Sequence, residues 1–139
     1  MEKLEHIGIA VRDLGRANET FALLLGKAHY KTEDVESEGV RTSFFQLGDV
    51  KIELLEAMRA DSPIQKFIDK KGEGIHHLAF QVTDIKETIK VFEQKGFEVV
   101  NREPKKGADN KMICFLHPKS TGGVLIELCE EINSFSSSR

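Results

Sequence analysis

The fold is decided by the stretch HIGIAVRDL at residues 6–14, because it occurs a second time as HLAFQVTDI at residues 77–85. Both stretches follow one pattern (His, apolar, small, apolar, any, Val, any, Asp, apolar) at a constant offset of 71 residues. A further match joins VKIEL at residues 50–54 to VLIEL at residues 124–128, at an offset of 74. Self-similarity at such a spacing indicates a duplicated structural unit.

The change of offset locates three additional residues in one turn of the second copy. Four residues separate Phe45 from Val50, whereas seven residues separate Leu116 from Val124. A surface turn tolerates an insertion of this size. The two copies are therefore predicted to share one order of elements.

Each copy is predicted to fold as strand, helix, strand, strand, strand. Apolar residues at helical spacing follow each histidine strand, and they are Leu14, Ala17, Phe21, Leu24 and Leu25, then Ile85, Ile89 and Phe92. Asp13 and Asp84 are the predicted N-caps of these helices, which end at Gly26 and at Lys95-Gly96. Further strands are expected at residues 27–34, 40–47, 50–56, 97–101, 112–116 and 123–129.

The predicted fold class is α+β, with two βαβββ modules that form a curved mixed-sheet cleft and carry their helices on the outer face. The first module covers residues 1–58 and the second covers residues 74–131. Residues 59–73 link them through a short helix that Ser62-Pro63 opens. Residues 132–139 are serine-rich and are expected to be disordered.

Composition narrows the possible partners. The 139 residues are 40% hydrophobic and 31% charged, and they contain no apolar stretch long enough to span a bilayer. No secretion signal opens the chain, so a cytoplasmic location is expected. A net charge of −3 argues against nucleic acid, which requires a basic face. Cys114 and Cys129 are expected to stay unpaired in such a compartment.

Four polar residues stand at equivalent positions of the two copies. Because side chains alternate along a strand, His6 and His77 are predicted to project from the face that carries small residues, into open space. Glu53 and Glu127 each lie between an isoleucine and a leucine, opposite the apolar face of their strand. A carboxylate in that position is costly to bury without a partner.

Two imidazoles and two carboxylates suit a divalent ion such as Co²⁺, Mn²⁺, Ni²⁺, Fe²⁺ or Zn²⁺. Taken singly, a strand histidine is more often structural, and a strand glutamate is usually a solvated edge residue. Their equivalent positions and common face favour a shared metal ion instead.

Four stretches of the chain resemble the methylmalonyl-CoA epimerases of the vicinal oxygen chelate (glyoxalase-like) superfamily: GIHHLAF at residues 74–80, FLHPKS at 115–120, GVLIEL at 123–128 and DSPI at 61–64. The resemblance implies that His6, Glu53, His77 and Glu127 bind the metal, with Co²⁺ favoured. It also implies an acyl-CoA substrate and a homodimer. His77 is the expected ligand because it, and not His76, aligns with His6.

The implied reaction is metal-dependent epimerisation of methylmalonyl-CoA at C2, by proton abstraction and reprotonation through a metal-stabilised enolate. Glu127 and Glu53 are then the expected catalytic acid and base. The chain departs from part of this family, in which a glutamine replaces Glu53 and a further glutamate stands near Thr42. Thr42 cannot act as that base, so the resemblance leaves the second base open.

Basic residues and rival functions complete the prediction. Lys105, Lys106, Lys111 and Lys119 are candidates to bind the CoA phosphates, although such lysines are more often only solvated.

One alternative function is that of a glyoxalase-type isomerase of a glutathione thiohemiacetal. Another is a metal-free small-molecule-binding module of the same fold, which would have no reason to keep the four polar residues together.

Overall fold

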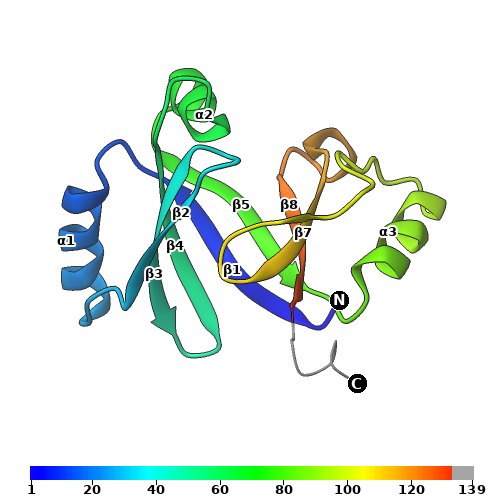
Figure 1. The fold of residues 1–139 in the computed structure, drawn as a ribbon, viewed down its shortest axis with the longest axis horizontal. Helices are drawn as coiled ribbons and strands as arrows, with labels where there is room; N and C mark the ends of the chain where they lie inside the picture. Colours follow the sequence, from blue (N-terminus) through cyan, green and yellow to red (C-terminus); the bar gives the residue numbers. More distant parts are fainter. Residues whose placement is uncertain (133–139) are drawn as a thin grey trace. The chain divides into compact units, whose positions relative to one another are not determined.

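The computed structural model describes residues 1–132, which divide into two compact units (Figure 1). The first unit is Glu5–Leu78, and the second unit is Met1–Leu4 together with the described residues from Ala79 onward. Apart from Ile132, the tail predicted for residues 132–139 lies outside the described residues. Among the described residues, no helix combines the length and the apolar character that crossing a membrane requires.

The first unit is a mixed sheet with helices α1 and α2. Its elements are β1 (Lys3–Ala10), α1 (Leu14–Leu25), β2 (Lys31–Val35), β3 (Val40–Leu47), β4 (Val50–Ala57), α2 (Pro63–Lys71) and β5 (Gly74–Gln81). The first residues of β1 and the last residues of β5 belong to the second unit. The strand order is β2-β3-β4-β1-β5. Strand β1 runs parallel to β4, and β4 pairs with β3 in an antiparallel hairpin. The predicted order of strand, helix, strand, strand, strand is confirmed in this copy.

The second unit repeats this arrangement from the end of β5 onward. It contains α3 (Ile85–Gln94), β6 (Lys105–Lys106), β7 (Lys111–Leu116), a short 3₁₀ turn (Pro118–Ser120) and β8 (Ile126–Glu131). The strand order is β5-β8-β7-β6, with β7 and β8 antiparallel. The mixed strand directions and the separate helices confirm the predicted α+β class.

The strand predicted at residues 97–101 is wrong. Only an isolated bridge joins Val99 to Leu116, and the two-residue strand β6 replaces the predicted one. The reason is the side chain of Asn101, which accepts a hydrogen bond from the Phe115 amide and donates one to the Ile113 carbonyl. The Asn101 side chain thus forms hydrogen bonds to β7 that the backbone of a regular neighbouring strand would form.

Two other strands begin later than predicted. The strand expected from residue 27 begins at Lys31. The strand expected from residue 123 begins at Ile126, because Gly122 and Gly123 have φ angles of 69° and 93°. That left-handed backbone continues the turn rather than the strand.

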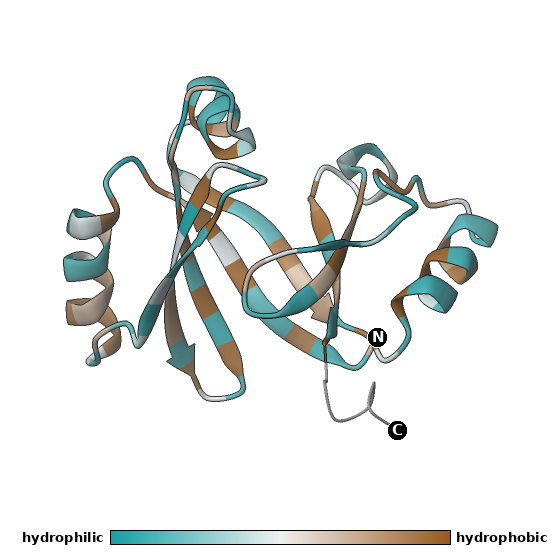
Figure 2. Cartoon of the chain, in the orientation of Figure 1, coloured by the Kyte–Doolittle hydropathy of each residue, from teal (hydrophilic) through white to brown (hydrophobic). Residues whose placement is uncertain are grey.

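Each helix buries one apolar face against its own sheet. In the first unit Ala17, Phe21 and Leu25 pack against a core that includes Phe45 and Leu54. Hydrophobic and hydrophilic bands alternate along the strands, as a half-buried sheet requires (Figure 2). Leu24 was predicted on the buried face but is 71% exposed, because Ala22 takes that place on the helix.

In the second unit the predicted helix face is confirmed. Ile85 and Ile89 are buried, and Phe92 packs against the cluster that they form with Leu116 and Leu128. The predicted N-caps are also confirmed, since the Asp13 and Asp84 side chains each accept a hydrogen bond from a backbone amide in the first turn of their helix. Cys114 and Cys129 are both buried, and the structure pairs neither of them in a disulfide bond.

Candidate metal centre

Parallel pairing of β1 and β4 places the polar residues of the first unit on one face of the sheet. His6 lies opposite Lys51, and Gly8 lies opposite Glu53. Directly opposite residues project from the same side of a sheet, so His6, Lys51 and Glu53 share a face. The sequence alternation predicted this placement for His6 and Glu53.

The His6 and His77 side chains meet within the first unit. Their Nε2 atoms are 3.0 Å apart, and the two rings are nearly perpendicular, at 86°. Both residues are 5% exposed, so the open space expected in front of them is instead filled by the rings themselves. At this distance the two nitrogens are in hydrogen-bond contact, and the same arrangement would offer two donors to one small ion.

Gly8 provides the room for this arrangement. A Cβ atom at position 8 would lie 2.2 Å from Cε1 of His77, far inside van der Waals contact. The His77 ring therefore occupies space that any other residue at position 8 would fill. The small residue that the sequence pattern places two positions after His6 is a steric requirement of the histidine pair.

Two carboxylates approach the other nitrogen of His6. Glu53 Oε2 lies 3.1 Å from Nδ1 of His6, and Glu5 Oε1 lies 2.6 Å from the same atom. The second oxygen of Glu5 lies 2.6 Å from Nζ of Lys51. Glu5, His6 and Glu53 can each direct one ligand atom to within 4.8 Å of the others.

The protonation of these groups follows from their surroundings. Burial raises the pKa of Glu5, but hydrogen bonds from His6 and Lys51 outweigh it and lower that pKa to about 2. Burial, together with His6 and His76, holds the pKa of His77 well below its usual value. Burial beside Lys71 lowers the pKa of His76 to about 4. His77 is therefore a neutral imidazole at neutral pH, which is the form that binds metal ions.

These residues fit a divalent metal ion. Imidazole nitrogens and carboxylate oxygens are ligands of the first-row divalent ions. Among the residues that the structure describes, the site brings together two buried carboxyl groups, Glu5 and Glu53, and the partly buried ammonium group of Lys51. Because buried carboxylates need compensating positive charge, a cation at the histidine pair would balance this group.

Glu5 and Lys51 are site residues that the sequence analysis missed. A signal for Lys51 was available, since it stands two positions before Glu53 and so shares its strand face. Alternation gave no signal for Glu5, because it assigns adjacent residues to opposite faces of a strand.

Thr42 is fully buried on β3. It lies on the same face of the sheet as Glu53, because Phe44 pairs with Glu53 and Thr42 stands two residues before Phe44.

The remaining predicted site residues belong to the second unit. Glu127 is buried in β8, where it pairs with Phe115 of β7. Lys105 and Lys106 are exposed on β6, and Lys111 is buried at the start of β7. The side chain of Lys119 is 71% exposed, and its Nζ lies 3.3 Å from Oε1 of Glu98.

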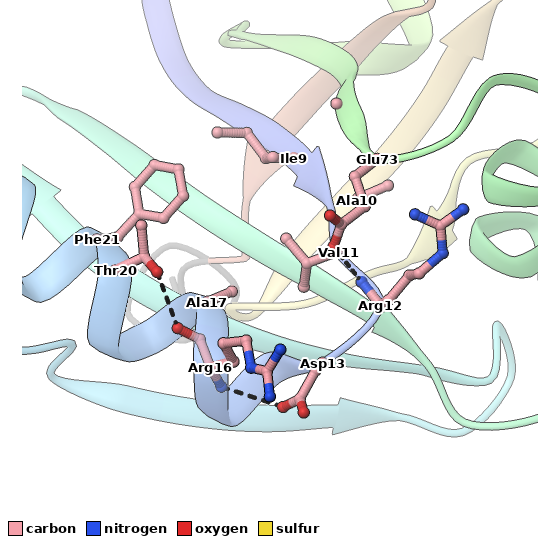
Figure 3. A pocket seen from close by; sticks show the side chains of 11 residues that line it. Ile9, Ala10, Val11, Arg12, Asp13, Arg16, Ala17, Thr20, Phe21 and Glu73 are labelled. Carbon is pink, nitrogen blue, oxygen red and sulfur yellow. Dashed lines mark hydrogen bonds between the residues drawn. The ribbon is translucent and has the colours of Figure 1, made fainter.

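A separate pocket of about 450 Å³ lies in the first unit beside the start of α1 (Figure 3). Apolar side chains such as Ile9, Val11 and Phe21 line it together with Arg12 and Arg16, whose side chains are exposed. None of the site residues predicted from the sequence lines this pocket. The histidine pair and this pocket are distinct features of the first unit.

Residues 5–115 match the family model described as the Glyoxalase/Bleomycin resistance protein/Dioxygenase superfamily, and the chain belongs to that superfamily. An uncharacterised protein of Bacillus subtilis is 42% identical over 130 residues, which cover 94% of this chain and 93% of that protein. The ethylmalonyl-CoA/methylmalonyl-CoA epimerase of Cereibacter sphaeroides is 38% identical, over 91% of this chain and 96% of the relative.

A solved structure agrees with these relatives. It is a variant of Streptomyces coelicolor methylmalonyl-CoA epimerase in complex with 2-nitronate-propionyl-CoA, with a TM-score of 0.90 and 36% identity. The match covers 94% of this chain and 95% of that one. Within the superfamily, the chain therefore belongs to the methylmalonyl-CoA epimerase family of enzymes.

The steric role of Gly8 can be tested by replacing it with alanine. We expect Gly8→Ala to displace the His77 ring and to raise the dissociation constant for Co²⁺ by about tenfold or more, the range seen when a supporting contact of a metal ligand is lost. Isothermal titration of metal-free protein with Co²⁺ measures this change. Gly15→Ala is the matched control, because its added carbon would meet only Asp13, at 3.5 Å. Affinity of Gly8→Ala within twofold of the wild type would contradict the assignment.

Proposed function

We propose that this protein epimerises methylmalonyl-CoA at C2, using a divalent metal ion bound by His6, Glu53, His77 and Glu127. The observation that carries the proposal is the buried pair of Nε2 atoms, 3.0 Å apart, with Glu53 beside His6. The names of the relatives supply the substrate, and the duplication supplies Glu127, which is equivalent to Glu53 in the second copy. Co²⁺ is the favoured ion.

In this proposal His6, Glu53, His77 and Glu127 would hold the ion, and the two carboxylates would also handle the proton. The hydrogen at C2 lies between a thioester carbonyl and a carboxylate, so its removal leaves a planar enolate. An ion held by these residues would supply Lewis-acid stabilisation of the charge that develops there. His6 and His77 would contribute neutral donors. Neutral ligands do not cancel the positive charge of the ion.

Inversion at C2 requires a base on one face of the planar enolate and an acid on the other. We assign Glu127 to one face and Glu53 to the other, because the duplication places them at equivalent strand positions. The Thr42 hydroxyl is too weak a base at neutral pH to replace either one. A dication lowers the proton affinity of a carboxylate that it binds, so each glutamate acts as a base only when it is not a ligand.

The CoA portion of the substrate calls for positive charge at the surface. Lys105, Lys106 and Lys119 are exposed lysines of the second unit and are the accessible candidates for its phosphates, whereas Lys111 is buried. A lysine binds phosphate as a point charge and needs no fixed geometry. The homodimer and the cytoplasmic location stay predictions from the sequence.

The proposed reaction is tested by proton NMR of methylmalonyl-CoA in D₂O. Protein loaded with Co²⁺ is expected to exchange the C2 hydrogen for deuterium, so that its proton signal disappears. Protein treated with EDTA is expected to leave that signal unchanged. Failure of exchange in protein shown to contain metal would contradict the proposal and favour a glyoxalase-type thiohemiacetal substrate. Protein that binds no metal and catalyses no exchange would favour the binding module instead.

The two-base assignment makes a separate prediction for each C2 epimer. Glu127→Gln is expected to slow exchange from one epimer by about 10²–10⁴-fold, and Glu53→Gln to slow exchange from the other, as loss of a general base does. Exchange is followed for each epimer in D₂O, and the metal content of each variant is measured alongside. Glu131→Gln, an exposed change on the same strand as Glu127, is the control. Normal exchange of both epimers in either variant would remove that glutamate from the mechanism.

A further inference from the structure

We infer that Glu5 is a positioning residue, which holds the His6 imidazole so that its Nε2 lone pair faces the metal position. The inference rests on the proposed metal site. Glu5 Oε1 accepts a hydrogen bond from Nδ1 of His6 at 2.6 Å, the shorter of the two carboxylate contacts to that atom. Glu5 is 3% exposed, so this hydrogen bond is shielded from solvent.

Lys51 completes the arrangement by binding the second oxygen of Glu5. Its ammonium group donates to Glu5 Oε2 at 2.6 Å, and its side chain is 16% exposed. A carboxylate held at both oxygens has a fixed orientation. Glu5 is therefore fixed between its neighbour in the chain and a residue of β4, and it fixes the ring in turn.

The second copy of the repeat supports this role by a different chemistry. The offset of 71 residues makes His76 the equivalent of Glu5, and Nδ1 of His76 lies 3.0 Å from Nδ1 of His77. In both copies, then, the residue that precedes the predicted ligand contacts its Nδ1 and leaves its Nε2 facing the other histidine. The offset of 74 makes Leu125 the equivalent of Lys51, so both members of the Glu5–Lys51 pair change together.

The hydrogen bond at Nδ1 decides which nitrogen of His6 can bind metal. A neutral imidazole carries one proton, and a carboxylate that accepts this proton's hydrogen bond at Nδ1 leaves the lone pair at Nε2. An anionic partner also makes the ring a stronger donor. His76 has no such charge to offer His77, so the two copies support their ligands unequally.

The test compares two double variants that both remove the Lys51 charge. Glu5→Leu with Lys51→Met removes the nearer acceptor at Nδ1 of His6 and leaves Glu53 Oε2 at 3.1 Å, whereas Glu5→Gln with Lys51→Met keeps an acceptor at position 5 while removing both charges. Two-dimensional ¹H–¹⁵N NMR of the imidazoles in metal-free protein reads the His6 tautomer, and titration with Zn²⁺ reads affinity. The leucine variant is expected to lose the single Nδ1–H tautomer of His6 and to bind Zn²⁺ about 10–100-fold more weakly, whereas the glutamine variant keeps the tautomer.

Several results would overturn the inference, and none of them depends on activity. An Nε2–H tautomer of His6 in metal-free wild-type protein would do so without any variant, even if the leucine variant fails to fold. So would an unchanged tautomer and a Zn²⁺ affinity within twofold of wild type in the leucine variant. Wild-type protein that binds no Zn²⁺ but shows the Glu5-dependent tautomer would reject the metal site and keep the role of Glu5 at His6.

Discussion

The structure depends on one constraint, which is the burial of two imidazole rings with their Nε2 atoms 3.0 Å apart. Such a pair is stable only if every remaining polar atom of the rings has a partner and if the neighbouring backbone leaves room. Gly8 provides the room, and Glu5 and His76 occupy the Nδ1 atoms. The parallel register of β1 and β4 then brings Glu53 to the same face.

Duplication explains how a small chain meets this constraint. A βαβββ unit presents one polar face and one apolar face, and its helix covers the apolar side, as α1 does over Phe45 and Leu54. Repeating the unit provides a second histidine and a second glutamate without a new fold. The two copies differ around the shared pattern, since Glu5 and Lys51 of the first correspond to His76 and Leu125 of the second.

The sequence was sufficient for the fold and for part of the site. Strand alternation placed His6 and Glu53 on one face, and the aspartate N-caps located both helices. Glu5 was out of reach, because alternation assigns it to the face opposite His6 and only the folded backbone brings their side chains together. The strand expected at residues 97–101 failed for a similar reason, since the Asn101 side chain takes up hydrogen bonds that a sequence pattern assigns to backbone. Such side-chain contacts depend on tertiary placement, which periodicity does not encode.

The central claim is that the histidine pair is a metal-binding site, and anomalous diffraction from crystals grown with Co²⁺ tests it most directly. The account predicts one cobalt peak per chain at the histidine pair, with Nε2 of His6 and Nε2 of His77 both at bonding distance. Absence of cobalt from the histidine pair, or a cobalt ion bound only by surface carboxylates, would contradict it. In that case the paired rings would be a structural feature of the fold, and proton transfer at C2 would need another source of charge stabilisation.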